Sequence, residues 1–363
     1  MSSSTSVVTE SSALADLCAR LAQEPAVALD TEFMRERTYR AELCLVQVGT
    51  TRDACCIDPL ALAQLEPLAA PLAQAAPLKV LHAARQDLEV LAPIAGRIAG
   101  VFDTQVAAAL AGFAAQIGYG ELTLKLLGVT LEKAHTRTDW SRRPLSAEQI
   151  DYALDDVRYL LPLREALLDR LAQLGRTAWL EEELAPLSDG AGQGVDPDKA
   201  WLRLKGLQGL DAGRIALATV LAAWRERRAI DRNRPRGWIL DDVALREIIL
   251  RVPRDKAALA AVPEMQEGFV RNSGDELLAL IHAAGVEDPP PPLPRRERPD
   301  PQFTALVKKL ATLNQQVAVE LGVSPEVLAT RRDLEQLARG DAPEALRRGW
   351  RREIIGERLR AAL

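Results

Sequence analysis

The 363-residue sequence is poor in aromatic side chains, histidine and cysteine. Three histidines are too few for a zinc site built from several imidazoles. The four cysteines, Cys18, Cys44, Cys55 and Cys56, lack metal-finger spacing, so we expect buried thiols in a reducing cytoplasm. No apolar run approaches the roughly 20 residues of a membrane span, and the N-terminus lacks the basic start and apolar core of a signal peptide. We therefore expect a cytoplasmic protein without a membrane partner.

The net charge of −5 is unevenly distributed along the chain. Residues 1–198 carry 17 Lys and Arg against 28 Asp and Glu, whereas residues 199–363 carry 29 against 23. An acidic first half joined to a basic second half fits an acidic metal site linked to a module that holds a polyanion. Charges that only keep helices in solution would give the same balance, so this asymmetry does not decide the function.

Short apolar runs alternating with helical periodicity predict an α/β layer fold with a mixed sheet over residues 1–187. We expect the first three strands to form an antiparallel meander. The predicted strands are 27–33, 43–49, 54–58, 78–82 and 101–103. The predicted helices are 13–23, 61–75, 83–91 and most of 104–184. A glycine-rich linker at 188–198 and a proline-rich linker at 286–300 then delimit two helical domains, 199–285 and 301–363.

The first predicted strand, Val27–Phe33, ends in two carboxylates two residues apart, Asp30 and Glu32. Because side chains alternate along a strand, both acids project from one face. Two adjacent carboxylates repel and are costly to desolvate, and a bound Mg²⁺ or Mn²⁺ is the usual remedy. In the alternative interpretation one acid caps a turn and the other faces solvent.

Three further residues follow similar local patterns. Asp87 lies about one turn into the helix after the fourth strand, and ligands gather near such strand ends in α/β sheets. Tyr152 and Asp156 are four residues apart in a helical pattern, so they share one helix face.

Three segments, LDTEF, HAARQDLEVL and YALDDVRYLLP, resemble the motifs of the Tyr-containing branch of DEDD exonucleases. RTYRAELCLVQV, FDTQVAAAL and TDWSRRPLSAEQIDYA resemble the ribonuclease D family within that superfamily. Residues 201–265 resemble that family's first HRDC (helicase and RNase D C-terminal) domain, and residues 302–363, less sharply, its second. The resemblance implies an α/β RNase H-like exonuclease domain with a mixed sheet, followed by two all-α HRDC-type domains.

The resemblance also implies roles for five residues. Asp30, Glu32, Asp87 and Asp156 correspond to the ligands of two divalent ions, Mg²⁺ or Mn²⁺, and Tyr152 to the residue that orients the nucleophilic water. Four carboxylates without basic partners would be untenable without such ions. A phenol, with an ordinary pKa near about 10, is a poor base at neutral pH, so we expect Tyr152 to position water rather than deprotonate it.

For each candidate substrate-contacting residue, a purely structural role is the alternative. His82 either contacts the terminal nucleotide or supports the fold. Trp140 and Phe33 can stack on a base or pack in the core, and we expect Phe33 to be buried. For Asp103 and Asp139 we expect helix capping, and for Asp58 a turn.

Two basic runs containing tryptophan occur in the second half of the chain. Arg225, Arg228, Arg232 and Arg236 belong to the first run, and residues 347–352 form the second. Arginines beside a tryptophan can pair with phosphates and stack on bases, and the family resemblance implies that the two runs, as groups, bind RNA. The alternative for the first run is a solvated helix end held by Glu226 and Asp231.

The activity implied by the resemblance is that of a monomeric 3′–5′ exoribonuclease. It would release 5′-mononucleotides from RNA 3′ ends, with tRNA precursors carrying 3′ extensions as substrates. A 3′–5′ exonuclease acting on DNA is one rival, because nothing in the sequence visibly reads a 2′-hydroxyl. A nucleic-acid-binding module with an inert nuclease domain is another, although four retained carboxylates and the tyrosine argue against inertness.

Overall fold

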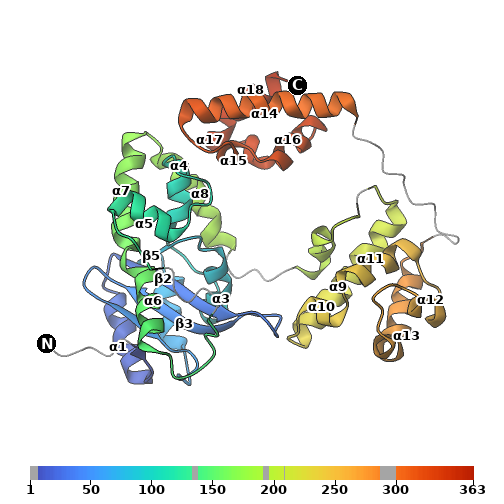
Figure 1. The fold of residues 1–363 in the computed structure, drawn as a ribbon, viewed down its shortest axis with the longest axis horizontal. Helices are drawn as coiled ribbons and strands as arrows, with labels where there is room; N and C mark the ends of the chain where they lie inside the picture. Colours follow the sequence, from blue (N-terminus) through green and yellow to red (C-terminus); the bar gives the residue numbers. More distant parts are fainter. Residues whose placement is uncertain (1–6, 133–137, 191–195, 208, 287–299) are drawn as a thin grey trace. The chain divides into compact units, whose positions relative to one another are not determined.

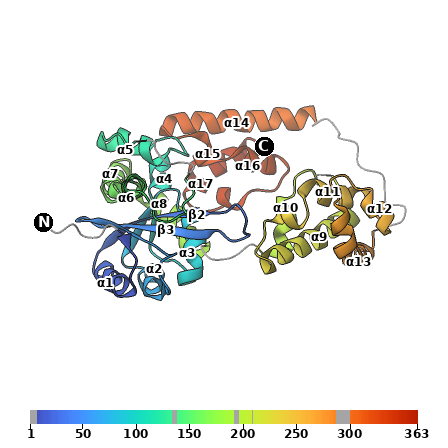
Figure 2. The same ribbon diagram turned by 60° about the horizontal axis from the view of Figure 1, so that its bottom comes forward.

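The computed structural model describes residues 7–132, 138–190, 196–207, 209–286 and 300–363. Residues 287–299 of the expected proline-rich linker and residues 191–195 of the expected glycine-rich linker lie outside the described residues, and residues 188–190 of the latter are helical. The chain forms two compact units (Figures 1 and 2). One comprises Met1–Met34, Leu43–Gly192 and Pro299–Leu363, and the other Arg35–Glu42 and Gln193–Arg298.

The first unit contains a six-stranded sheet in the order β1-β4-β3-β2-β5-β6. Its strands are β1 (Val7–Val8), β2 (Ala26–Met34), β3 (Glu42–Gly49), β4 (Ala54–Ile57), β5 (Leu78–Leu81) and β6 (Val101–Asp103). β2, β5 and β6 pair in parallel, as do β1 and β4, whereas β3 and β4 pair antiparallel. The predicted mixed sheet is confirmed. The two-residue β1 was not predicted, because so short a run carries no periodicity.

Helices cover both faces of this sheet (Figure 2). They are α1 (Ser11–Leu21), α2 (Ala69–Ala73), α3 (Arg85–Ala95), α4 (Thr104–Leu110), α5 (Tyr119–Leu127), α6 (Ala147–Arg158), α7 (Leu160–Gln173) and α8 (Thr177–Gly190). Alternation along β2 explains the two layers, since Val27 and Leu29 share a core with α1 and α3 while Ala28 packs toward α4 and α7.

The helix predicted over 61–75 is shorter than expected. A 3₁₀ turn (Glu66–Leu68) leads into α2, and both end by Ala73. The preceding residues form a turn, because the Asp58 carboxylate accepts from the backbone nitrogens of Leu60 and Ala61 at 3.0 and 3.3 Å. This confirms the turn predicted at Asp58.

The C-terminal helices of the first unit share a core with α7 and α8. They are α14 (Pro301–Leu321), α15 (Pro325–Leu328), α16 (Arg331–Ala338), a 3₁₀ turn (Glu344–Leu346), α17 (Gly349–Arg351), a π-helical turn (Arg352–Gly356) and α18 (Glu357–Ala361). Trp350 stacks on Trp179 of α8 with ring centroids 4.4 Å apart. This segment therefore packs directly on the α/β part.

The second unit is helical and has its own core around Leu217, Leu221 and Leu245. Its elements are a 3₁₀ turn (Pro197–Arg203), α9 (Ala212–Asp231), α10 (Arg236–Ile239), α11 (Asp242–Arg251), α12 (Lys256–Ala260) and α13 (Glu267–Ala283). Tyr39, from the segment Arg35–Glu42, packs on this core and donates a hydrogen bond to Glu226. Within the described ranges, no helix is both long and apolar enough to cross a membrane.

Candidate active site

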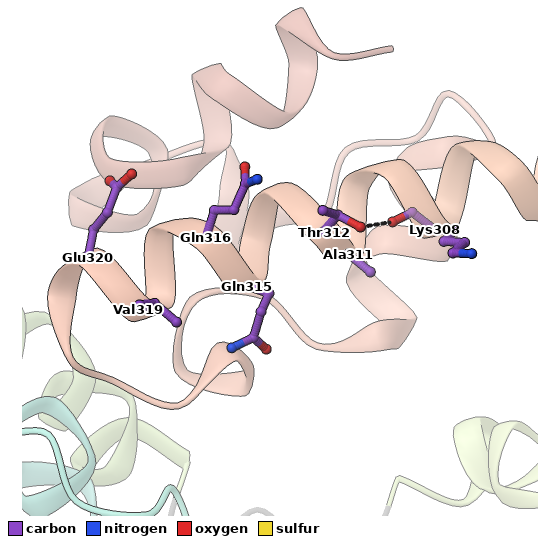
Figure 3. Close-up of a pocket in the computed structure, with 7 residues that line it drawn as sticks. All are labelled: Lys308, Ala311, Thr312, Gln315, Gln316, Val319 and Glu320. Atoms are coloured by element: carbon purple, nitrogen blue, oxygen red, sulfur yellow. Dashed lines mark hydrogen bonds between the residues drawn. The ribbon is translucent and has the colours of Figure 1, made fainter.

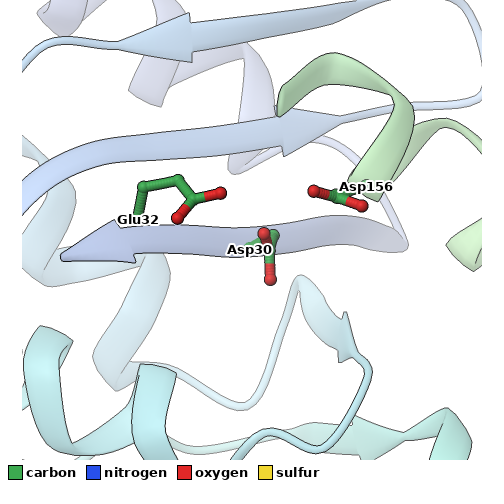
Figure 4. Close-up of side chains that lie close together, drawn as sticks. All are labelled: Asp30, Glu32 and Asp156. Carbon is green, nitrogen blue, oxygen red and sulfur yellow. The ribbon is translucent and has the colours of Figure 1, made fainter. Parts of the chain in front are cut away.

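Three carboxylates converge where β2 meets α6. Asp30 and Glu32 project from one face of β2, and Asp156 reaches toward them from α6 (Figure 4). One oxygen from each lies within 4.8 Å of the others. The i,i+2 pattern places Asp30 and Glu32 on one face of the strand as predicted, and the packing of α6 on β2 brings Asp156 to them.

The position of α6 is fixed at its start and along its length. Ser146 caps the helix through a capping box, in which its hydroxyl accepts from the Gln149 nitrogen at 3.2 Å and the Gln149 side chain accepts from the Ser146 nitrogen at 2.7 Å. Glycine at position 49 allows close approach, because a Cβ there would lie 3.3 Å from the Val157 carbonyl oxygen and 3.2 Å from Ala28 Cβ.

Asp87, in the first turn of α3, completes the acidic surroundings. It is buried, and its Oδ1 accepts a hydrogen bond from Thr31 Oγ1 at 2.5 Å. Asp87 is not among the three acids within 4.8 Å, yet its charge raises the pKa of both Asp30 and Glu32. It therefore lies beside the cluster rather than inside it.

Asp103 fixes the starts of two helices. Its carboxylate accepts from the backbone nitrogens of Gln105 at 2.8 Å and Val106 at 3.4 Å, which confirms the predicted cap of α4. The same carboxylate accepts from Ala83 and Ala84 at 3.0 and 2.9 Å, just before α3. Asp103 thereby ties α3, and with it Asp87, to the end of β6.

Burial raises the pKa of every acid in the site. It is the largest cause for Glu32 (about 8), Asp156 (about 7) and Asp87 (about 6), and neighbouring carboxylates add to it. Burial also raises the pKa of Asp30 well above its ordinary value, followed by the charges of Asp87, Asp156 and Glu32. Among the described residues, no Lys or Arg forms an ion pair with these acids. Such a donor set suits hard divalent cations.

Tyr152 faces the same site from α6. Its ring stacks on Trp140, with centroids 6.3 Å apart and an interplanar angle of 26°. Burial, then the charges of Asp156, Glu32 and Asp30, raises the pKa of Tyr152 to about 12. The phenol is therefore protonated at neutral pH, so it can donate a hydrogen bond but is a poor base.

The chain matches known proteins along nearly its whole length. The family model described as 3′–5′ exonuclease matches residues 5–172, and that of the HRDC domain residues 215–281. Ribonuclease D of Granulibacter bethesdensis is 42% identical over 98% of this chain and 91% of its own length. The chain belongs to the ribonuclease D family. Ribonuclease D of Acidiphilium cryptum is 43% identical over 95% of this chain and 89% of its own.

The solved structure of Escherichia coli RNase D, an exoribonuclease involved in structured RNA processing, agrees with the fold. It matches with a TM-score of 0.87 and 31% identity, over 99% of this chain and 98% of the other. The predicted family, RNase H-like fold and 3′–5′ exoribonuclease activity are confirmed. Exonucleases of this fold bind divalent metal ions, and the four acids of this ribonuclease D-family chain fit such ions. A second HRDC domain at 301–363 stays a prediction.

The predicted aromatic contacts divide into buried and exposed residues. Trp140 is only 4% exposed, which favours its core-packing alternative. Phe33 is half-buried, so the prediction that it is buried was wrong. The reason is that β2 runs beyond the core at its C-terminal end, where Met34 is also partly exposed.

His82 uses both ring nitrogens within the fold. Nδ1 lies 2.9 Å from Thr104 Oγ1 and Nε2 lies 2.9 Å from the Ile117 carbonyl oxygen. Burial lowers the pKa of His82. These contacts favour the structural alternative.

Two of the four predicted arginine contacts are occupied inside the second unit. Arg225 is buried, and its Nη1 donates to the Leu240 carbonyl at 2.9 Å and to Asp242 at 2.6 Å. Arg228 pairs with Glu276 over the Trp224 ring. Arg225 is therefore not placed to contact a phosphate, because α9 turns it toward the domain interior. The side chain of Arg228 is 22% exposed, so its phosphate contact stays a prediction.

The other two arginines are accessible. Arg232 is exposed, and Arg236 is half-buried with Nη1 3.7 Å from Glu226. The sequence interpretation missed Arg234, whose guanidinium lies over the ring of Trp238, a side chain that is 60% exposed. Arg232, Arg234, Arg236 and Trp238 are called the arginine–tryptophan surface below.

Two further sequence expectations need correction. In the second basic run, Trp350 is buried, its backbone nitrogen donates to Glu182 at 3.1 Å and Arg351 pairs with Glu183, so these two residues hold the C-terminal segment in place. Arg347, Arg348 and Arg352 of the same run are exposed, and RNA binding by them stays a prediction. Asp139 caps no helix, since its carboxylate accepts from the Ser141 nitrogen in a turn and α6 begins later.

An ion pair that no sequence signal indicated supports the site. Arg143 donates to both carboxylate oxygens of Asp58, at 2.6 and 2.7 Å, and to the carbonyl of Trp140 at 2.7 Å. It thereby holds the segment from which Trp140 supports Tyr152.

A shallow hollow lies away from this site, on one face of α14. It is lined by Lys308, Ala311, Thr312, Gln315, Gln316, Val319 and Glu320 (Figure 3). It gathers no group of acids and is no candidate active site.

Proposed function

We propose that Asp30, Glu32, Asp87 and Asp156 hold two divalent ions, Mg²⁺ or Mn²⁺, at the end of β2. The observation that carries this proposal is the convergence of three carboxylates of raised pKa within 4.8 Å, with the fourth beside them. When bound, such ions activate water on one side of a phosphodiester and stabilise the leaving oxygen on the other. The residues of the chain supply the ligands and the orientation.

Tyr152 then positions the attacking water. Its protonated hydroxyl offers one hydrogen-bond donor and accepting lone pairs at the edge of the acid cluster. Stacking on Trp140 limits the rotation of the Tyr152 ring, so its hydroxyl is held in a fixed position. Attack on the last phosphodiester would release a nucleoside 5′-monophosphate and leave a 3′-hydroxyl on the shortened RNA.

For the substrate, we infer a single-stranded RNA 3′ end, with tRNA precursors carrying 3′ extensions as the class implied by the family. Phe33, half-buried and directly after Glu32, can stack on the terminal base. The arginine–tryptophan surface supplies exposed cations and a ring for the RNA backbone and bases. The enzyme would work as a cytoplasmic monomer.

We propose the sequence-based domain organisation, in which the end of α8 extends into the first linker as far as Gly190. The exonuclease domain covers 1–187 and the first HRDC domain 199–285, while 301–363 forms a second HRDC-like domain. Linkers at 188–198 and 286–300 join them.

A digest of matched RNA and DNA oligonucleotides tests this function. With Mg²⁺ or Mn²⁺ we expect 5′-mononucleotides from RNA, and EDTA or Asp30→Asn should stop their release. Equal rates on DNA would identify a general exonuclease, and binding without cleavage would identify an inert binding module. A tRNA with a short 3′ extension, compared with the mature tRNA, tests the substrate class.

A further inference from the structure

Gln47 is a fully buried polar residue in the middle of β3. Gln47 is 0% exposed, and neither its Nε2 nor its Oε1 has a hydrogen-bond partner among the residues that the structure describes. Leaving a buried amide unpaired is costly, so such a group calls for a functional explanation.

The geometry of the sheet places Gln47 next to Asp30. A Cβ at Gly49 would touch Ala28 Cβ at 3.2 Å, so these two positions adjoin on the face that α6 covers. Gln47 lies two residues before Gly49, and Asp30 two residues after Ala28, so both point to that same face. The connection from Met34 to Glu42 is too short for a parallel crossover, so β2 and β3 run antiparallel. In that register Asp30 and Gln47 lie opposite each other.

On the other side of Gln47, the neighbouring strand β4 offers its amide no strong hydrogen-bond acceptor. Cys56 of β4 is in register with Gln47, and a buried thiol is only a weak hydrogen-bonding group. The carboxylate of Asp30 is therefore the strong acceptor beside this amide.

We propose that Gln47 is a positioning residue for Asp30. Its Nε2 donates a hydrogen bond to the Asp30 carboxylate when that carboxylate ligates a divalent ion. A hydrogen bond to the ligand fixes its orientation, and losing such a partner weakens metal affinity by about 10- to 100-fold. The inference rests on the metal site proposed above.

Calorimetric titration of the full chain with Mn²⁺ tests this role. We expect Gln47→Leu to weaken Mn²⁺ binding by at least about tenfold. The same variant should not lower the unfolding temperature of the metal-free protein, because no hydrogen bond is lost. At saturating Mn²⁺ its turnover should recover much of the loss seen at low Mn²⁺. Gln47→Met, unbranched and adaptable, serves if the leucine variant does not fold.

The control is Asn314→Leu, at another buried amide. Asn314 Nδ2 donates to the Pro325 and Ala329 carbonyls at 3.0 and 3.1 Å, so this variant should unfold more easily but bind Mn²⁺ normally. Unchanged Mn²⁺ affinity in the Gln47 variants, or a lower unfolding temperature of their metal-free form, would overturn the positioning role. Equal Mn²⁺ binding by the wild type and Asp30→Asn would refute the metal site itself.

Discussion

At the scale of single residues, four acids with raised pKa values link metal binding to pH. Glu32, Asp156 and Asp87 have pKa values of about 8, 7 and 6 in the metal-free fold, against about 4 in an unfolded chain. Between pH 4 and 8 the folded state therefore binds more protons than the unfolded state. These groups make the free energy of unfolding fall as pH rises through this window.

Bound divalent ions should reverse this fall of the free energy of unfolding with rising pH. A bound cation stabilises the ionised carboxylates, so we expect the stabilisation by Mn²⁺ to grow from pH 5 to pH 8. Thermal unfolding in EDTA and in Mn²⁺ at each pH measures the difference, in which unrelated titrating groups cancel. Asp30→Asn should shrink it. A difference that is independent of pH would contradict the shared site.

Tyr152→Phe separates positioning from binding. The ring and its stacking on Trp140 remain, but the hydroxyl is gone. We expect near-normal Mn²⁺ and RNA affinity with a kcat lower by about 100-fold, the scale at which misplaced reacting groups cost rate. Single-turnover digestion of labelled RNA, beside Mn²⁺ and RNA titrations, checks both. Wild-type kcat in this variant would rule out the positioning role.

At the scale of elements, Asp103 makes the placement of Asp87 testable. Its two carboxylate oxygens accept from four backbone nitrogens at the starts of α3 and α4. An amide can accept through one oxygen only, so Asp103→Asn should cost about 1–2 kcal/mol of stability and weaken Mn²⁺ binding. Chemical denaturation and Mn²⁺ titration measure both effects. Asp139→Asn, in an exposed turn, is the control, and equal effects of the two variants would contradict the helix-fixing role.

Gly349 is the element-scale test of how the C-terminal segment is held. A Cβ there would lie 1.9 Å from Glu182 Oε2, the atom that accepts from the Trp350 nitrogen. We expect Gly349→Ala to lower the unfolding temperature and to expose residues 301–363 to limited proteolysis. Gly340→Ala is the matched control, because Gly340 also has a positive φ but no atom of the described residues lies within 4 Å of its Cβ position. An equal fall of the unfolding temperature in both variants would show that backbone strain, and not the clash with Glu182, causes the loss.

What the sequence could predict follows from the range of each interaction. Asp30 with Glu32, and Tyr152 with Asp156, are local pairs whose geometry a strand or helix dictates. The pairs Arg143–Asp58 and Arg225–Asp242 depend on tertiary packing, and no local period encodes them. The helix predicted at 61–75 failed for the same reason, since the Asp58 turn occupies its start.

At the scale of the whole molecule, the basic net charge of the second half does not show which of its arginines can bind RNA. The basic second half includes arginines that already pair with acids of the same chain, such as Arg225 with Asp242 and Arg351 with Glu183. The arginine–tryptophan surface includes two exposed arginines of the first basic run, Arg232 and Arg234, that can contact a polyanion. Its exposed members, and not the total charge, should therefore set the affinity for RNA.

Replacing Arg232 and Arg234 by Ala tests that surface. Each lost phosphate contact should reduce the slope of log affinity against log salt by about 0.7, the value for single strands. We expect weaker RNA binding at low salt, with unchanged unfolding temperature and unchanged Mn²⁺ affinity. Arg331→Ala removes an exposed arginine that pairs with Glu335, and it controls for net charge. If that variant reduced the salt dependence as much as each replacement in the surface, RNA would respond to overall charge, and the surface would have no special part in binding.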